Sequence, residues 1–307
     1  FVMGTKGVAG TEGALGTLNV TESGAMNVAM GKYTVTNLAL TKGTGSTDVG
    51  TTLTVAKLTD DAASTFDNKG TLSVTTVDTV NSAFTNSGDF NVASNTVLAN
   101  TFTNNAGRAV FDGTVEMQKA VTNAKDAVIK TAGFTVSSAL TGTHDNVINN
   151  AGRLESTGAN TVAGSMIVAK DGALVATDVT NITTGRINVL GDSRFKEVNV
   201  GVNGRGALGA AADALIHADT ITVGTLGQLR LRDGATVVAK NLKVDGMMSA
   251  GNVSWALGSA AVNGWNEKNA DRYATLMGEY ATPTAMLFSL SSRAVFGIAT
   301  YGADTVN

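Results

Sequence analysis

The stretch Phe84-Thr85-Asn86-Ser87-Gly88-Asp89-Phe90-Asn91-Val92 is one copy of a motif that recurs along the chain, and this recurrence decides the fold. Further copies begin at Phe66, Thr103, Val121 and Ile148. When the copies are aligned on asparagines at positions 68, 86, 105, 123 and 150, the steps are 18, 19, 18 and 27 residues. Such spacing is typical of a solenoid, in which each repeat buries its apolar face only by stacking on its neighbours.

Four of the five copies contain a glycine turn followed by alternating apolar and polar residues, which is the signature of a β-strand, and the weaker copy at Val121 lacks the glycine. The regular copies occupy about 64–156, and looser ones occur at Gly16–Val20 and Gly227–Leu231. We therefore predict an all-β fold, a right-handed parallel β-helix. Residues 1–256 would form a β-solenoid of roughly 18–20-residue coils, and 257–307 a C-terminal cap or flanking segment made of a short helix plus two strands.

The alignment also predicts which side chains stack inside the coils. Phe66 would lie over Phe84 and then roughly over Phe102, and Leu72 would lie over Phe90. The aligned asparagines have two explanations that the sequence leaves open. Asparagine tolerates positive φ in turns, and side-chain amides held in register can also form a ladder of hydrogen bonds.

Composition narrows the classes of function. The 307 residues include 36 Gly, a single Pro (Pro283), no Cys and 15% charged residues, a mixture that suits short strands joined by turns. The net charge of −3 gives no basic footprint, so we expect no nucleic-acid partner. The lack of Cys rules out disulfides and thiol chemistry, but it does not identify the compartment.

Targeting features are missing from the sequence given. No apolar run approaches the roughly 18 to 20 residues that a membrane-spanning helix needs. The first residues do not follow the pattern of a signal peptide, and the chain opens in mid-pattern. We expect it to be a fragment or the mature part of a longer protein.

The repeat stops near Trp265. Residues 265–280 predict a short amphipathic helix, because Tyr273, Leu276, Met277 and Tyr280 fall on one face. Two strands are expected after it, at about 285–290 and 293–299. This segment either covers an open β edge or binds a partner. In the second case the candidate partner-binding residues are Trp265, Tyr273 and Tyr280.

Motifs for chemistry are weak. The glycines of Gly204-Arg205-Gly206-Ala207-Leu208-Gly209 match a dinucleotide-binding pattern, but no βαβ unit surrounds them, so we interpret them as a loop in the solenoid wall. His144 precedes Asp145 without a nucleophile motif, and His217 begins no metal-ligand spacing. We assign no catalytic, cofactor-binding or metal-binding residues and expect no cofactor.

The alternative of a glycan-cleaving enzyme depends on the carboxylates, because such an enzyme needs two carboxyl groups close together in a cleft. Here the acids fall mostly in expected turns: Asp60, Asp61, Asp89, Asp112, Asp145, Asp171 and Asp233. The sequence also has few of the aromatic residues that sugar-binding clefts usually display. An enzyme is therefore not the leading hypothesis.

The motifs at Phe84–Val92 and Ile148–Leu154 resemble the passenger repeats of bacterial autotransporter adhesins and related filamentous-haemagglutinin-like exoproteins. The resemblance covers about 14–255. It implies a Gram-negative surface or secreted protein, located outside the cell, whose β-helical stalk serves adhesion, aggregation or biofilm formation. Contact with the outer membrane would come only through segments outside this sequence.

The leading hypothesis is thus a non-enzymatic extracellular structural or adhesive β-solenoid that binds through an extended face. Its expected partners are a host or bacterial surface glycan or protein, with self-association as a further expectation. One alternative is a β-helical carbohydrate-active enzyme or glycan-binding fibre. Another is a self-assembling filament or surface-layer subunit, since an exposed β edge is a template for another chain.

Overall fold

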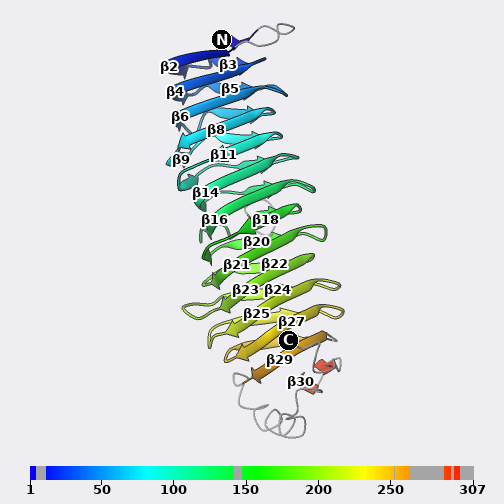
Figure 1. The fold of residues 1–307 in the computed structure, drawn as a ribbon. Helices are drawn as coiled ribbons and strands as arrows, with labels where there is room; N and C mark the ends of the chain where they lie inside the picture. The colour runs from blue at the N-terminus through cyan, green and yellow to red at the C-terminus, as the bar shows by residue number, and fades with distance from the viewer. Residues whose placement is uncertain (5–11, 142–146, 252, 263–286, 292–293, 298–307) are drawn as a thin grey trace. The chain divides into compact units, whose positions relative to one another are not determined.

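The chain folds as a parallel β-solenoid. The computed structural model describes residues 1–4, 12–141, 147–251, 253–262, 287–291 and 294–297. Within these residues it makes about 12 turns and contains no helix. The coils belong to two compact units, Phe1–Ser156 (unit 1) and Thr157–Asn307 (unit 2). In each unit short strands form one sheet, sheet A, and a second sheet, sheet B, contains the longer strands together with some short ones (Figure 1).

In unit 1 both sheets are parallel, and each strand pairs with the strand one coil away. The strands of sheet A are β1 (Val2–Met3), β3 (Ala25–Val28), β5 (Thr44–Thr47), β7 (Thr65–Asn68), β10 (Ala83–Asn86), β13 (Phe102–Asn104), β15 (Val121–Asn123) and β17 (Ile148–Asn150). Those of sheet B are β2 (Glu12–Thr21), β4 (Lys32–Thr41), β6 (Thr52–Asp60), β8 (Thr71–Thr76), β9 (Thr79–Val80), β11 (Asp89–Val92), β12 (Thr96–Leu98), β14 (Arg108–Met117), β16 (Val128–Val136) and β18 (Arg153–Ser156).

Unit 2 repeats this arrangement. Its sheet A contains β20 (Ser165–Val168), β22 (Arg186–Val189), β24 (Ala207–Ala210), β26 (Gln228–Leu231) and β28 (Met247–Ala250). Its sheet B contains β19 (Asn160–Val162), β21 (Ala173–Ile182), β23 (Asp192–Val200), β25 (Leu215–Val223), β27 (Thr236–Val244) and β29 (Ser254–Val262). The two strands expected near the end are present as an antiparallel pair, β30 (Leu287–Ser291) and β31 (Ala294–Gly297). The expected helix at 265–280 lies outside the described residues.

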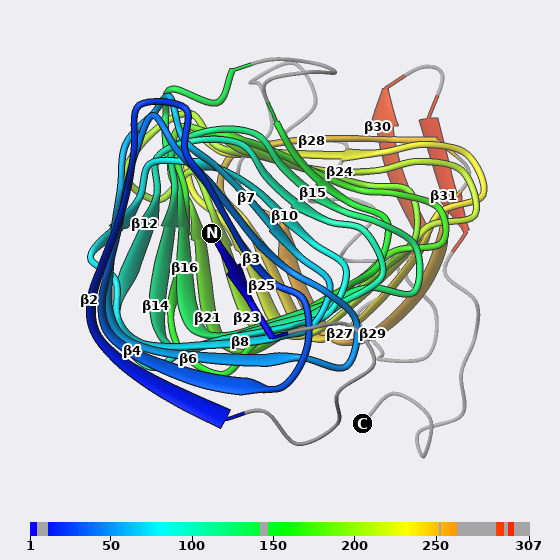
Figure 2. The same ribbon diagram turned by 90° about the horizontal axis from the view of Figure 1, so that it is seen from above.

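The long strands of sheet B bend, so that each coil has three walls. In β4 the buried Val35 and Leu38 are separated by two exposed residues, which a straight strand with period two would not allow. The pairing of β14 with β16 shifts register between Phe111 and Thr114, at the equivalent position. Seen from above, the turns of unit 1 enclose their interior between sheet A and the two arms of sheet B (Figure 2).

Stacked phenylalanines fill part of the interior of unit 1. The Phe66 and Phe84 rings lie 5.2 Å apart and nearly parallel, and the Phe84 and Phe102 rings lie 5.6 Å apart. Phe90 pairs in register with Leu72. These stacks are the predicted ones. Offset aromatic pairs contribute about 0.5–1.5 kcal/mol each beyond the area that they bury.

A ladder of buried asparagines runs beside the phenylalanines. The side-chain amide of Asn68 donates to Oδ1 of Asn86 at 2.7 Å, and Asn86 donates to Asn104 at 2.8 Å. Asn104 donates to Asn123 at 2.9 Å, and Asn123 to Asn150 at 2.7 Å. All five side chains are buried. The ladder therefore links successive coils through groups that water does not reach.

Two details of the expected asparagine column are corrected. β10 pairs with β13 so that Asn86 lies opposite Asn104, and the alignment on position 105 was wrong by one residue. The explanation by positive φ was also wrong. Among the described residues, those other than glycine with positive φ are Glu22, Ser23, Lys42, Asp126 and Asp213.

The glycine of the motif is needed because successive coils approach closely at the corner that follows the ladder. A Cβ atom on Gly88 would lie 2.0 Å from the carbonyl oxygen of Gly70, and one on Gly107 would lie 2.1 Å from that of Gly88. Real Cβ contacts do not occur at such distances. The motif therefore places a buried asparagine amide in the strand and, shortly after it, a glycine at the corner where a side chain would not fit.

Replacing Asn86 by Ala tests the ladder. The change leaves buried groups of Asn68 and Asn104 without their partner, and each unsatisfied buried group costs about 1–3 kcal/mol. Asn91→Ala is the matched control, because Asn91 lies on the next strand, is only half-buried, and its amide is 3.5 Å from Ser73 Oγ. We expect thermal melting to show a clear loss of stability for Asn86→Ala only. Equal losses in the two variants would contradict the ladder's role.

Acidification should weaken unit 1 through Glu155. Lys130 Nζ lies 2.7 Å from the Glu155 carboxylate, which also contacts Arg153. The hydrogen bond from Lys130, followed by that from Arg153, lowers the pKa of Glu155 below its ordinary value of 4.5. Because the folded-state pKa is depressed, the stabilisation is present above about pH 4.5 and is lost as the pH falls through the folded-state pKa.

We expect Glu155→Gln to lower the melting temperature slightly at neutral pH, by an amount that corresponds to about 1 kcal/mol or less. The gap between wild type and variant should close at acidic pH. Glu12→Gln serves as the control for the loss of one carboxylate. A gap that stays constant down to strongly acidic pH would show that the ion pairs contribute nothing.

Candidate ligand-binding groove

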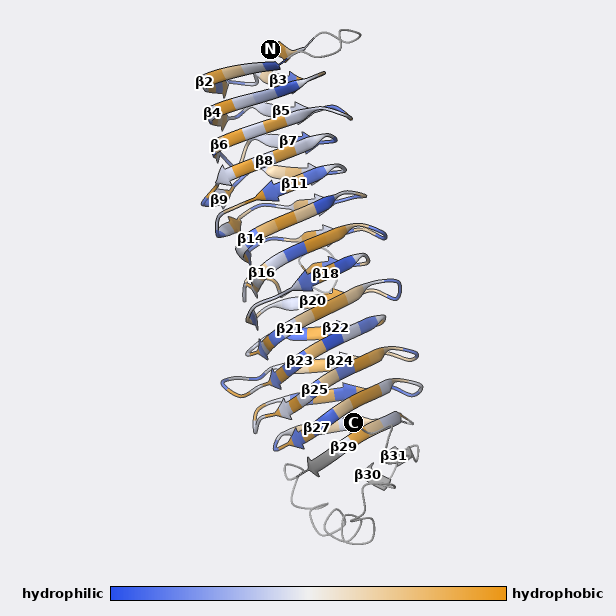
Figure 3. Cartoon of the chain, in the orientation of Figure 1, coloured by the Kyte–Doolittle hydropathy of each residue, from blue (hydrophilic) through white to orange (hydrophobic). Residues whose placement is uncertain are grey.

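The outward side of sheet A in unit 2 carries the candidate site. Alternate residues of its strands point inward and are buried, such as Ile187, Leu208 and Leu229. The residues between them face outward and are half-buried or exposed. Figure 3 shows hydrophobic and hydrophilic residues following one another along these strands. The interior pattern leaves the outward positions free to vary in size and charge.

Three small outward residues in one coil form the floor of a groove. The register places Ala207 between Arg186 and Gln228 in the neighbouring coils, and Gly209 between Asn188 and Arg230. Backbone hydrogen bonds from Ala211 to Val189 and from Arg232 to Ala210 continue this register beyond the strands. Ala211 is therefore the third floor position. The long side chains of the adjacent coils form the walls.

The hollow enclosed in this way has a volume of about 730 Å³. We call it the arginine groove, and it is lined by Arg186, Asn188, Val189, Leu190, Ala207, Gly209, Ala210, Ala211, Arg230, Leu231, Arg232, Met247 and Ser249. Neighbouring strands lie about 4.8 Å apart, so the backbones of its two walls are roughly 10 Å apart. The three floor positions span roughly 13 Å along the strand direction.

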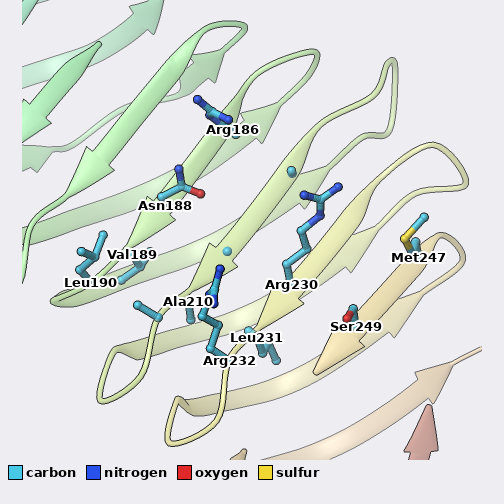
Figure 4. Close-up of a pocket in the computed structure, with 13 residues that line it drawn as sticks. Arg186, Asn188, Val189, Leu190, Ala210, Arg230, Leu231, Arg232, Met247 and Ser249 are labelled. Atoms are coloured by element: carbon cyan, nitrogen blue, oxygen red, sulfur yellow. The ribbon is translucent and has the colours of Figure 1, made fainter. Parts of the chain in front are cut away.

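The groove is positively charged. Its described lining contains three arginines and no carboxylate. In Figure 4 the side chains of Arg230 and Arg232 extend toward the side on which Arg186 and Asn188 lie. Ion pairs elsewhere in unit 2 join Arg194 to Asp192, Lys240 to Asp219 and Lys243 to Asp245. Such a cluster favours an anionic ligand, because the guanidinium fork matches carboxylate oxygens.

A second hollow, of about 470 Å³, lies at the glycine corner of unit 1. The charges around it are mixed, with Lys69 and Arg108 close to Asp89 and Asp126. Lys69 already pairs with Asp67 at 2.8 Å. Charges of both signs therefore surround this corner, and the arginine groove is the better candidate for a ligand-binding site.

The residues singled out in the sequence lie away from this groove or outside the described chain. Trp265, Tyr273, Tyr280 and His144 lie outside the described residues. His217 is exposed on β25 of sheet B, in register with Arg194 and Val238. The G-x-G-x-x-G match ends in β24, as expected for a wall segment, and its last glycine, Gly209, lies in the groove floor.

The expectation that the acids lie in turns is wrong for Asp60, Asp89 and Asp112, which lie in β6, β11 and β14. Asp60 and the neighbouring Asp61 are bonded to backbone groups of adjacent coils. Asp60 accepts hydrogen bonds from the backbone N–H groups of Asn81 at 2.8 Å and Ser82 at 2.9 Å. Asp61 accepts one from the backbone of Lys42 at 3.0 Å. The side-chain hydrogen bond from Ser64, followed by the one from Lys42, lowers the pKa of Asp61. These carboxylates hold successive turns together.

In the part of the chain that the structure describes, no three His, Cys, Asp or Glu side chains gather where they could hold a metal ion. Among the same residues there is no helix that is both long and apolar enough to span a bilayer.

Comparisons with protein-family models, with curated proteins and with solved structures found no match to this chain. The groove is therefore assigned from its own geometry.

Replacing Gly209 by Val should narrow the groove at its floor without harming the fold. A Cβ atom on Gly209 would lie 3.2 Å from Asn188 Oδ1, an atom that can move with its side chain, and 3.6 Å from the carbonyl oxygen of Arg230. Valine also suits a strand better than glycine, by up to about 1 kcal/mol. We expect an unchanged or slightly higher melting temperature. A marked loss of stability would show that the floor is packed more tightly than described.

Proposed function

We propose that this protein is a non-enzymatic extracellular binding scaffold of a bacterial surface or secreted protein, which mediates adhesion or aggregation through an extended face. The observation that carries the proposal is the open arginine groove on the outward side of a regular stack of coils. The β-solenoid and the repeat are consistent with an autotransporter-type or filamentous-haemagglutinin-like passenger, which we propose as its class.

The regular interior supports this role. Asparagine and phenylalanine stacks fix the register between the coils of unit 1 from β7 onward, and continuous parallel pairing does the same in unit 2. Outward side chains are thus held at repeating distances of about 4.8 Å from coil to coil. A polymer or a cell surface with repeated groups can then contact several coils at once, and weak contacts add up.

The alternative of a glycan-cleaving enzyme has less support. The usual mechanism needs a protonated carboxylic acid and a second carboxylate on opposite sides of the bond to be cleaved. The described lining of the arginine groove has no carboxylate. Asp60 and Asp61 accept backbone hydrogen bonds instead. We therefore propose binding without turnover.

Bead adhesion tests the proposal. Beads coated with the protein should attach to epithelial monolayers or to bacterial cells, or should aggregate with one another, more than beads coated with albumin. The reason is that many copies on one bead convert weak contacts into stable attachment. Microscopy of attached beads gives the measurement, and beads coated with the thermally unfolded protein are the control.

Attachment at the albumin level on every surface, together with no aggregation, would contradict a role in adhesion. The same protein should be incubated with neutral and acidic polysaccharides. A steady release of new reducing ends or unsaturated sugar products would favour the enzymatic alternative.

A further inference from the structure

We propose that the arginine groove binds a linear acidic glycan composed of uronic acids. The inference rests on the proposed function, since it names the ligand class of that binding surface. It starts from the charges. Arg230 and Arg232 stand two residues apart on one wall, roughly 7 Å along the strand direction, and Arg186 stands on the opposite wall. A ligand in the groove therefore meets cationic groups on both of its sides.

The spacing of the arginines favours a polymer with regularly repeated anionic groups. A uronic-acid chain carries one carboxylate on each acidic sugar, and successive carboxylates can meet successive guanidinium groups. Arginine binds a carboxylate through two parallel N–H···O bonds, which fixes the orientation of the ligand as well as attracting it. The overall charge of the protein is −3, so the attraction is local to the groove.

The other lining residues favour sugar over other polyanions. The Asn188 amide and the Ser249 hydroxyl can donate to and accept from sugar hydroxyls. Leu190 and Met247, which are 39% and 45% exposed, offer apolar surface to the C–H faces of a sugar ring. The described lining has no aromatic side chain on which a nucleobase could stack. An acidic glycan uses the charges, the polar groups and the apolar groups together.

Calorimetric titration of the folded protein with polygalacturonate tests the proposal. We expect binding that weakens with added salt, as charge-assisted contacts at a surface do. The double variant Arg230→Gln/Arg232→Gln should bind about tenfold more weakly or worse. The control Arg194→Gln/Lys196→Gln removes the same charge from exposed positions of sheet B in the same unit and should bind like wild type.

Gly209→Val provides a second and independent test, because it leaves every charge in place and fills the floor. It should also weaken binding of polygalacturonate about tenfold while keeping the wild-type melting temperature. If the double arginine variant does not fold, this variant alone decides between the outcomes.

Three outcomes of the titrations would overturn the proposal. They are the absence of binding to polygalacturonate, equal affinity of the wild type and both groove variants, and tighter binding of polyglutamate or single-stranded DNA with the same dependence on the arginines. Dextran, a neutral polysaccharide, should not bind. If beads adhere equally well with and without the arginines, the groove assignment is wrong and the adhesive function is retained. If polygalacturonate binds in the titrations but beads do not adhere, the groove assignment is retained and the adhesive function is wrong.

Discussion

The hydrogen-bonded column of buried asparagines is the interaction on which unit 1 depends from β7 to β17. Each amide donates to the next asparagine, and Asn86 also donates to the backbone carbonyl of Gly88 at 3.0 Å. A buried amide without partners is costly, and hydrogen bonds in a dry interior strengthen one another. A coil that slipped by one residue would leave several such groups unsatisfied. The ladder therefore fixes the register, and the stacked phenylalanines and the close glycine corners follow from that register.

In unit 2 apolar side chains occupy the positions that the asparagines hold in unit 1. In β10 the last residue of the strand, Asn86, belongs to the ladder. The last residues of the sheet A strands in unit 2 are instead Val168, Val189, Ala210, Leu231 and Ala250, and all five are buried. Apolar packing is not directional, and it tolerates several residue types provided that the volume is filled. Only the asparagine column needs the same residue in each coil that it joins, from β7 to β17. For this reason the repeat is obvious in that part of unit 1 and loose in unit 2, although both have the same coil.

These differences explain what could be predicted from the sequence. Glycine turns and period-two alternation were enough for the fold class and for the stack of Phe66, Phe84 and Phe102. The doublet Asn104-Asn105 made the ladder position ambiguous by one residue, because only the pairing of Asn86 with Asn104 distinguishes them. The groove was missed because it depends on outward residues 21 positions apart, as in Asn188, Gly209 and Arg230. A comparison of side-chain sizes at that spacing, long then small then long, could have found it.

Such a groove has little effect on stability, because its floor and walls consist of outward residues. The buried residues that alternate with them form the core. Ala207 and Gly209 could be large, and Arg186 or Arg230 small, without disturbing the buried Ile187, Leu208 and Leu229 beside them. The interior of a solenoid sets the spacing of its outer face, and the outer residues then set what that face can bind. A stable stack of coils can thus acquire or lose a binding groove by changing a few outward side chains in adjacent coils. It follows that the outward residues of adjacent coils indicate which ligand such a protein binds. The repeat itself indicates mainly the fold.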